Sequence, residues 1–571
     1  MFLCSLPLVA VDEEPVAEPE DESEGLLPLP GELDFLAVPF EEVAEPVNRR
    51  VVESFDLPAV DRYLPPRARA IPSVEVRGFR FEGNTVFKDA ELEETINGFR
   101  GRKLIQEDLD SVRFRLTELY VSNGYLNSGA RIPDQDLADG VLEIQITEGR
   151  LSDVITTGNE ELSDRYLSSR ILVHNDRPLH FPTLQRRLQV MQSNPNIGRL
   201  NAELKPGLAP GEALMTLEVE EAPKWSYGVD LHNQRSPSVG GEQMDLWLEN
   251  RNVSGYSDTF RARLGVFSGN PDELEFAGLD NVFLQYERPI LADDTSLLLA
   301  WQTEDYSILE EPFRSLFIDG ESWSMTGGFR RPLYRTLQDE VWLSLMLEKS
   351  HDETYLLGRP FSISPGSVNG ELDLSILRLG ADWTRRTRKS VLAMRTALSL
   401  GFDGLGATSQ LTEPDGQFFT WTVDGQYSRR VHDRGDLVVL HGGFQFSNDP
   451  LPPPAQMRVG GRYTVRGYRE NFLVRDNGFY GGVDYQFPLL LDGENGGWSL
   501  WAVPFVDAGI GWNDNPSMTE SLISVGVGLK ASYSNWFRGE LFWGIPLKNE
   551  GQASGNIQDD GIHFRMSFAR F

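Results

Sequence analysis

Cysteine is nearly absent from this chain, since Cys4 is the only one among 571 residues. A single thiol excludes a disulfide framework and any zinc site built from cysteine pairs. The seven histidines are scattered along the chain and form no His-Glu-x-x-His motif of the kind that binds zinc on a helix. We therefore expect neither a metal centre nor any other cofactor.

Basic residues are few relative to acidic ones, with Lys+Arg 53 against Asp+Glu 86 and a formal charge of −33. A surface that binds nucleic acid needs a stripe of lysine and arginine over the phosphates. The acidic balance of this chain therefore argues against a nucleic-acid partner.

Long hydrophobic runs are also missing, because no stretch approaches the roughly eighteen apolar residues of a transmembrane helix. A membrane β-barrel is compatible with this absence, since its strands show only alternation. The chain has no Gly-x-x-x-x-Gly-Lys-Ser/Thr loop for a nucleotide. No Ser-His-Asp order or close pair of carboxylates can be placed in it either. We therefore predict that the protein is not an enzyme.

The amino-terminal segment carries little that could form a core. Residues 1–10 (MFLCSLPLVA) are apolar with no basic residue before them, which indicates the remnant of a truncated signal peptide, or alternatively an apolar tail. Residues 11–70 are rich in proline and acidic side chains, and their first basic residues are Arg49 and Arg50. Such a segment repels itself and buries little surface, so we predict a mobile linker.

Two small α/β modules are predicted over residues 71–149 and 150–222. In the first, residues 74–79 alternate as a strand, two stretches with helical spacing follow, and residues 141–146 form a clear closing strand. The second module repeats the order strand, helix, helix, strand, strand. Its turn Gly158-Asn159 matches Gly83-Asn84 of the first module, which favours a tandem repeat.

Neither module contains a plausible catalytic cluster, so two interpretations remain for them. They are either spacers or docking sites for a peptide. A three-stranded sheet backed by two helices leaves an edge strand that can accept an extended chain through main-chain hydrogen bonds. We favour docking.

The predicted barrel comprises residues 223–571, and from Trp225 to Phe571 apolar and polar side chains alternate nearly throughout, as in the stripe Val341, Leu343, Leu345 and Leu347. In a closed sheet that spans a bilayer, the apolar face meets lipid and the polar face lines the lumen. At roughly twenty to twenty-four residues per strand and connection, 571 − 224 = 347 residues make about sixteen strands. The predicted fold class is mainly β, with a transmembrane antiparallel β-barrel of about sixteen strands after the two α/β modules. A soluble β-sandwich is the alternative.

Two motifs follow one another late in the chain. The first is Val465-Arg466-Gly467-Tyr468, and the second is the Phe-x-Asp-x-Gly sequence formed by Phe505, Asp507 and Gly509. With both motifs in this order, residues 72–571 resemble the hemolysin secretion/activation proteins of the ShlB/FhaC/HecB type. These are the outer-membrane transporters of two-partner secretion, in the superfamily that combines POTRA domains with a barrel. The resemblance identifies the two modules as POTRA domains.

The resemblance implies that a loop around residues 450–475 folds into the barrel lumen with Arg466 at its tip. Asp507 would lie on the inner wall and offer a carboxylate to this planar guanidinium. Gly467 would allow the tight turn, and Gly509 would remove a side chain where the loop tip approaches the wall. The alternative is that Arg466 and Asp507 are separate charges facing water. Members of this family also have a plug helix before the first module, which residues 11–70 would have to supply.

By the same resemblance, the protein would export a large secreted partner from the periplasm to the cell surface or medium. The POTRA domains would lie in the periplasm, and the barrel would lie in outer-membrane lipid after insertion by the barrel-assembly machinery. Folding of the partner outside the cell would drive export. The alternative within the superfamily is a barrel-assembly factor, which usually carries more than two POTRA domains. A passive porin fits the two modules and the inward loop poorly.

Overall fold

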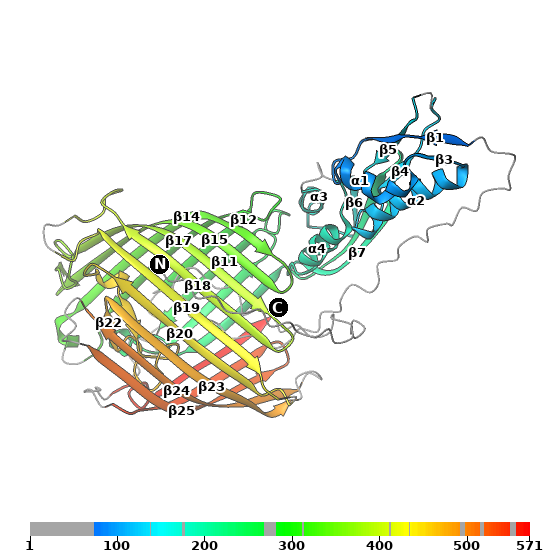
Figure 1. The fold of residues 1–571 in the computed structure, drawn as a ribbon. Coiled ribbons are helices and arrows are strands. Elements are labelled where there is room, and N and C mark those ends of the chain that lie inside the picture. The colour runs from blue at the N-terminus through cyan, green and yellow to red at the C-terminus, as the bar shows by residue number, and fades with distance from the viewer. Residues whose placement is uncertain are drawn as a thin grey trace, which may run out of the picture.

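The computed structural model describes residues 73–136, 139–173, 178–267, 281–310, 313–409, 413–432, 434–491, 497–513, 519–548 and 555–570. The predicted signal remnant (1–10), all of the predicted linker with its possible plug helix (11–70), and Phe571 lie outside these described residues. Figure 1 shows two small modules, blue to cyan, at one end of a barrel coloured green to red. None of the described helices is long and apolar enough to cross a membrane.

The first module packs two helices against a three-stranded sheet of order β2-β5-β4, in which β2 is parallel to β5 and β4 is antiparallel to it. Residues 74–79 were expected to form one strand. They are instead divided at Arg77, because β1 pairs with β3 while β2 joins the main sheet. The elements are β1 (Val74–Val76), β2 (Gly78–Glu82), α1 (Asp89–Ile96), η1 (Asn97–Phe99), β3 (Arg102–Leu104), α2 (Gln106–Ser122), β4 (Gly129–Arg131) and β5 (Val141–Thr147).

The second module repeats this plan with a sheet of order β6-β8-β7, in which β6 is parallel to β8 and β7 is antiparallel to it. Alternate residues of β8 are buried beneath the helices, and the residues between them are partly or fully exposed. Its elements are β6 (Arg150–Thr157), α3 (Asp164–Leu172), α4 (Phe181–Gln192), β7 (Ile197–Pro206) and β8 (Glu212–Glu221).

The Gly-Asn turn has the same geometry in both modules. Gly83 and Gly158 have φ values of 88° and 80°, a left-handed conformation that glycine adopts without steric cost. The side-chain amides of Asn84 and Asn159 each donate a hydrogen bond to the carbonyl three residues later, over 2.9 and 2.7 Å. The turn therefore starts the first helix of each module in the same way.

A glutamate at the end of each module closes the same turn from the other side. Glu148 accepts hydrogen bonds from the backbone amides of Thr85 and Val86 over 2.7 and 2.8 Å. In the second module, Glu221 accepts a hydrogen bond from the backbone amide of Leu162 over 2.7 Å. Burial alone would raise the pKa of Glu148, but the hydrogen bonds that it accepts outweigh burial and hold the pKa below its usual range.

Sixteen strands within the described part of the chain close into an antiparallel barrel, with the last strand, β27, pairing back onto the first, β9. The prediction of about sixteen strands is confirmed. The two-residue strand β16 (Arg359–Pro360) pairs with β15 at the end of the β15–β17 hairpin. The barrel strands are β9 (Trp225–His232), β10 (Gln243–Asn250), β11 (Thr259–Phe267), β12 (Asn281–Pro289), β13 (Ser296–Ser307), β14 (Ile318–Arg335), β15 (Asp339–Leu356), β17 (Glu371–Arg386), β18 (Ser390–Gly401), β19 (Phe418–Arg430), β20 (Leu437–Ser447), β23 (Asn477–Leu491), β24 (Trp498–Trp512), β25 (Glu520–Tyr533), β26 (Phe537–Pro546) and β27 (Ile562–Arg570).

Alternation along these strands separates a lipid-facing surface from the lumen. On β15, Leu345 and Leu347 are 49% and 41% exposed on the outer face. Ser344, which points to the opposite face, is buried. Large apolar side chains on an outer barrel surface are stable only where lipid covers them. The period of two that we noted in the sequence therefore corresponds to an apolar outside and a polar inside. Two short 3-10 helices lie in connections between barrel strands: η2 (Pro237–Val239) and η3 (Phe313–Leu316).

The second module is attached to the barrel rim by partly buried polar contacts. Arg170 on α3 pairs with Asp294 in the β12–β13 turn over 2.7 Å, and Arg335 at the end of β14 pairs with the same carboxylate over 2.9 Å. Asn196 and Ser257 are hydrogen-bonded to each other across the junction over 2.6 Å. Charged pairs and amides that are partly shielded from water restrict the relative position of the groups they join. The second module is thus held in a defined position on the rim.

Candidate functional site: the inward loop and the barrel wall

The connection between β20 and β23 folds back against the inner barrel wall, and we call residues 448–476 the inward loop. It contains the 3-10 helix η4 (Pro453–Ala455) and a small antiparallel pair, β21 (Met457–Val459) and β22 (Leu473–Arg475). It forms a small apolar core against β25 on the wall, made of Val459, Val465, Tyr468, Leu473 and Leu522.

Arg466 lies at the centre of the contact between loop and wall. Its Nε and Nη2 donate to the two carboxylate oxygens of Asp507 over 2.8 Å each, and its backbone amide donates to Asp507 over 3.0 Å. Nη1 donates to Asp484 over 3.2 Å. The guanidinium also lies 3.7 Å from the ring centroid of Phe505 and 5.0 Å from that of Phe542. Arg466 is 1% exposed and Asp507 is fully buried.

This arrangement places one cation between two carboxylates in a site without solvent access. All four carboxylate oxygens of Asp484 and Asp507 accept a hydrogen bond from Arg466. His441 lies close by, with Nε2 3.8 Å from Asp507. His441, Asp484 and Asp507 could supply ligand atoms to a divalent cation. The Arg466 guanidinium already binds both carboxylates, so a cation would have to displace this guanidinium. Breaking such a buried pair costs about 3–5 kcal/mol, because the remaining charge has no partner.

Glycines allow the loop tip to lie directly on the wall. Gly467 has a φ of 94°, and a Cβ there would meet the carbonyl carbon of Gly544 on β26 at 2.9 Å. A Cβ on Gly544 would in turn meet the backbone nitrogen of Gly467 at 2.6 Å. A Cβ on Gly509 would meet the side chains of Val459 and Val465 at 2.6 and 2.8 Å. A side chain at any of these three glycines would force the loop away from the wall.

Further side chains of the loop reach other strands. The Tyr468 hydroxyl lies 3.1 and 3.0 Å from the carbonyl oxygens of Ile523 and Lys548. Arg462 binds Glu540 on β26 through two nitrogens over 2.8 and 2.6 Å. The loop is thus attached to several strands around the wall rather than at one point.

The structure brings the two sequence motifs together, since Arg466 contacts Asp507 and Val465 lies against Gly509. Our sequence reasoning missed Asp484, Glu540, Phe542 and Gly544. In the β23–β24 ladder, Asp484 faces Phe505, which places its carboxylate beside that of Asp507. A strand register of this kind is a property of two segments together, and neither segment alone shows it.

Comparisons with known proteins agree with this architecture. A family model described as haemolysin secretion/activation protein ShlB/FhaC/HecB matches residues 211–531, and a model of the ShlB-type POTRA domain matches residues 74–149. The outer membrane transporter CdiB of Dickeya dadantii is 24% identical over 521 residues, which cover 87% of each chain. The hemolysin transporter protein ShlB of Serratia marcescens is 23% identical over 445 residues, covering 73% of this chain and 72% of that one.

Solved structures share the fold. CdiB from Escherichia coli superposes with a TM-score of 0.67 at 21% identity, covering 90% of this chain and 93% of the other. BamA from Haemophilus ducreyi lacking POTRA domains 1–3 gives a TM-score of 0.51 at 13% identity, covering 87% and 100%. The family model spans more than half of the chain, including most of the barrel and both motifs. The chain therefore belongs to the haemolysin secretion/activation protein ShlB/FhaC/HecB family, whose members are non-enzymatic outer-membrane transporters of two-partner secretion.

Proposed function

We propose that this transporter moves one large partner protein from the periplasm to the cell surface, and that the partner binds the second POTRA module before it enters the barrel. In this proposal, the contact between Arg466 and Asp507 holds the inward loop in its resting position. The observation that carries the proposal is the buried guanidinium between two wall carboxylates. Burying these charges inside the lumen costs desolvation free energy, and such a contact is expected where the position of the loop controls passage of the partner.

The docking site that we propose is the edge strand β7. Among the described residues, β7 is ten residues long and pairs on one side only, with β8. The edge strand β4 of the first module has only three residues. A long edge strand can bind an extended segment of a partner through main-chain hydrogen bonds. The length of β7 therefore favours the second module as the docking site.

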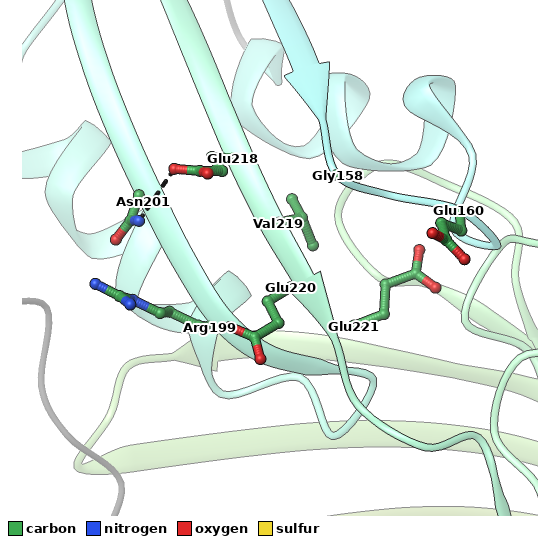
Figure 2. Close-up of a pocket in the computed structure, with 8 residues that line it drawn as sticks. All are labelled: Gly158, Glu160, Arg199, Asn201, Glu218, Val219, Glu220 and Glu221. Carbon is green, nitrogen blue, oxygen red and sulfur yellow. Dashed lines mark hydrogen bonds between the residues drawn. The ribbon is translucent and has the colours of Figure 1, made fainter.

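Acidic side chains surround a cleft of about 450 Å³ beside β7. Figure 2 shows Asn201 and Arg199 on one side and glutamates of β8 across from them, with Asn201 donating to Glu218 over 3.2 Å. The cleft is lined by Gly158, Glu160, Arg199, Asn201, Glu218, Val219, Glu220 and Glu221. Four carboxylates against one guanidinium favour a partner segment that carries lysine or arginine.

Reversing charge at this cleft should reduce secretion. We expect Glu218→Lys with Glu220→Lys to lower the secreted partner by about tenfold, which corresponds to about 1.4 kcal/mol of lost binding. The measurement is the amount of partner in the medium at equal transporter abundance. Glu94→Lys with Glu118→Lys makes the same charge change on exposed helix positions of the first module and serves as the control. Equal loss in both double variants would contradict docking at the β7 cleft.

A deletion strain tests the proposed transport directly. Removing the transporter should deplete one or a few large exported proteins from the medium and cell surface, while other outer-membrane barrels stay at normal abundance. A broad fall in unrelated barrel proteins would instead favour barrel assembly, the activity that we considered as the alternative. Proteomics of the outer membrane and medium distinguishes the two outcomes.

A further inference from the structure

The barrel closes between β9 and β27, which we call the closing seam and which, among the described residues, is the shortest ladder between neighbouring strands of the sixteen-stranded barrel. Six residue pairs form it, from Arg565↔His232 to Arg570↔Tyr227. The β14–β15 ladder, by comparison, contains seventeen pairs. The first residues of β27 therefore extend beyond the seam ladder. On this side, their backbone groups form hydrogen bonds with side chains instead of with strand β9.

Asn233 continues the seam where the ladder stops. Its side-chain Nδ2 donates to the carbonyl of Ile562 over 2.8 Å, and its Oδ1 accepts from the amide of Phe564 over 2.8 Å. Its backbone amide also donates to the Phe564 carbonyl over 3.3 Å. A primary amide has the donor and acceptor of a peptide group, so this fully buried side chain acts as one additional residue of strand pairing.

Gln558 connects this region to the inward loop. Its Nε2 donates to the carbonyls of Asn233 and Arg235 over 2.7 Å each. Its Oε1 accepts from the backbone amide of Glu470, in the inward loop, over 2.9 Å. The next residue, Asp559, pairs with Arg469 of the loop over 2.7 Å. Gln558 is fully buried, so each of these bonds would be costly to leave unmade.

We propose that Gln558 is a positioning residue. It couples the position of the inward loop on the barrel wall to the stability of the strand pairing in the closing seam. Its buried side-chain amide, carried by the chain before β27, contacts both the chain after β9 and the loop. When the loop is in place, Glu470 fixes the orientation of this amide, and Nε2 then supports the β9 side of the seam. Displacing the loop removes the third bond and weakens the seam. The inference deepens the proposed loop movement, but the contacts themselves do not require transport.

Amide hydrogen exchange of the full-length protein in lipid nanodiscs tests this coupling without any partner. Gln558→Glu keeps an acceptor for the Glu470 amide but loses both donated bonds to Asn233 and Arg235. We expect exchange in residues 225–232 and 562–570 to accelerate by about tenfold, and exchange in β14 and β15 to stay unchanged. Arg466→Ala, which detaches the loop tip from the wall, should accelerate the same two strands.

Gln445 provides a matched control. Its Nε2 also donates to two backbone carbonyls of the loop region, those of Ala455 and Asp476, over 3.0 and 3.1 Å. It lies on β20, outside the closing seam. Gln445→Glu therefore removes an equivalent pair of bonds at the base of the loop, while the Arg466 contact that seats the loop tip stays intact, so exchange in β9 and β27 should stay unchanged.

Two results would overturn the inference. One is wild-type exchange in β9 and β27 of Gln558→Glu, and the other is equal acceleration in Gln445→Glu. If Gln558→Glu does not yield a folded barrel, Arg466→Ala replaces it, because displacing the loop removes the Glu470 bond that orients Gln558. Unchanged seam exchange in Arg466→Ala would then overturn the inference in the same way. Loss of secretion is not the readout, so failure of the proposed docking or transport would leave this comparison intact.

Discussion

Arg466→Ala should reduce secretion of the partner by at least about a hundredfold while the barrel remains folded. The change leaves the buried carboxylates of Asp484 and Asp507 without their cation, at a cost of about 3–5 kcal/mol. This cost falls mainly on the seated loop, because the guanidinium binds the wall through the side chains of Asp484 and Asp507, and the loosening expected at the closing seam leaves the other ladders in place. At about 1.4 kcal/mol per tenfold, the fraction of correctly seated loops falls by two orders of magnitude or more. The measurement is secreted partner per unit of transporter in the outer membrane.

Two further arginine variants sharpen this experiment. Arg475→Ala removes a loop arginine whose partner is Glu520 and whose side chain is 26% exposed. A partly exposed pair contributes little, so secretion should stay near the wild-type level. Arg466→Lys keeps the charge but cannot donate from a planar fork to two carboxylates at once, and should remain strongly impaired. Wild-type secretion by Arg466→Ala would show that the contact does not control transport.

Asp507→Ala should have nearly the same effect as Arg466→Ala, and the double variant should lose little more. Asp507 accepts three of the hydrogen bonds donated by Arg466, including the one from its backbone amide. Residues that act as one interaction are strongly non-additive, and a double-mutant cycle measures this coupling. Secretion of all three variants, normalised to transporter abundance, gives the coupling directly.

Asp484→Ala provides the graded comparison. Asp484 accepts only the two bonds from the terminal nitrogens, and the pair with Asp507 survives its removal. We expect a smaller loss of secretion than for Asp507→Ala. Full additivity between Arg466→Ala and Asp507→Ala would contradict a shared role, as would an Asp484→Ala effect larger than that of Asp507→Ala.

Features with a local physical cause could be predicted from the sequence. The period of two predicted an apolar outer face, because each strand residue points to the opposite side from its neighbour. The Gly-Asn turns predicted the repeat, because a left-handed glycine and an asparagine side chain determine the turn by themselves. The motifs around Arg466 and Asp507 drew attention to the correct wall strand through the family resemblance.

The rest depends on strand pairing between distant segments. Asp484 becomes a partner of Arg466 only through the register of β23 on β24, and Gly544 matters only because β26 passes beneath Gly467. Asn233 and Gln558 are ordinary amides in the sequence, separated by more than three hundred residues. Barrel closure brings Asn233 and Gln558 into contact, and no local sequence pattern predicts this contact. Predicting these residues would require the registers of the complete barrel.

The attachment of the second module to the barrel rim through Arg170 and Asp294 has a kinetic consequence. In the docking that we propose, a partner segment bound at β7 is tethered within a small volume next to the barrel rim, because this contact holds its module there. Tethering replaces a bimolecular encounter by an intramolecular one, with an effective concentration in the millimolar range for short spans. Once a segment has docked, the rate of entry should therefore be independent of how dilute the partner is in the periplasm.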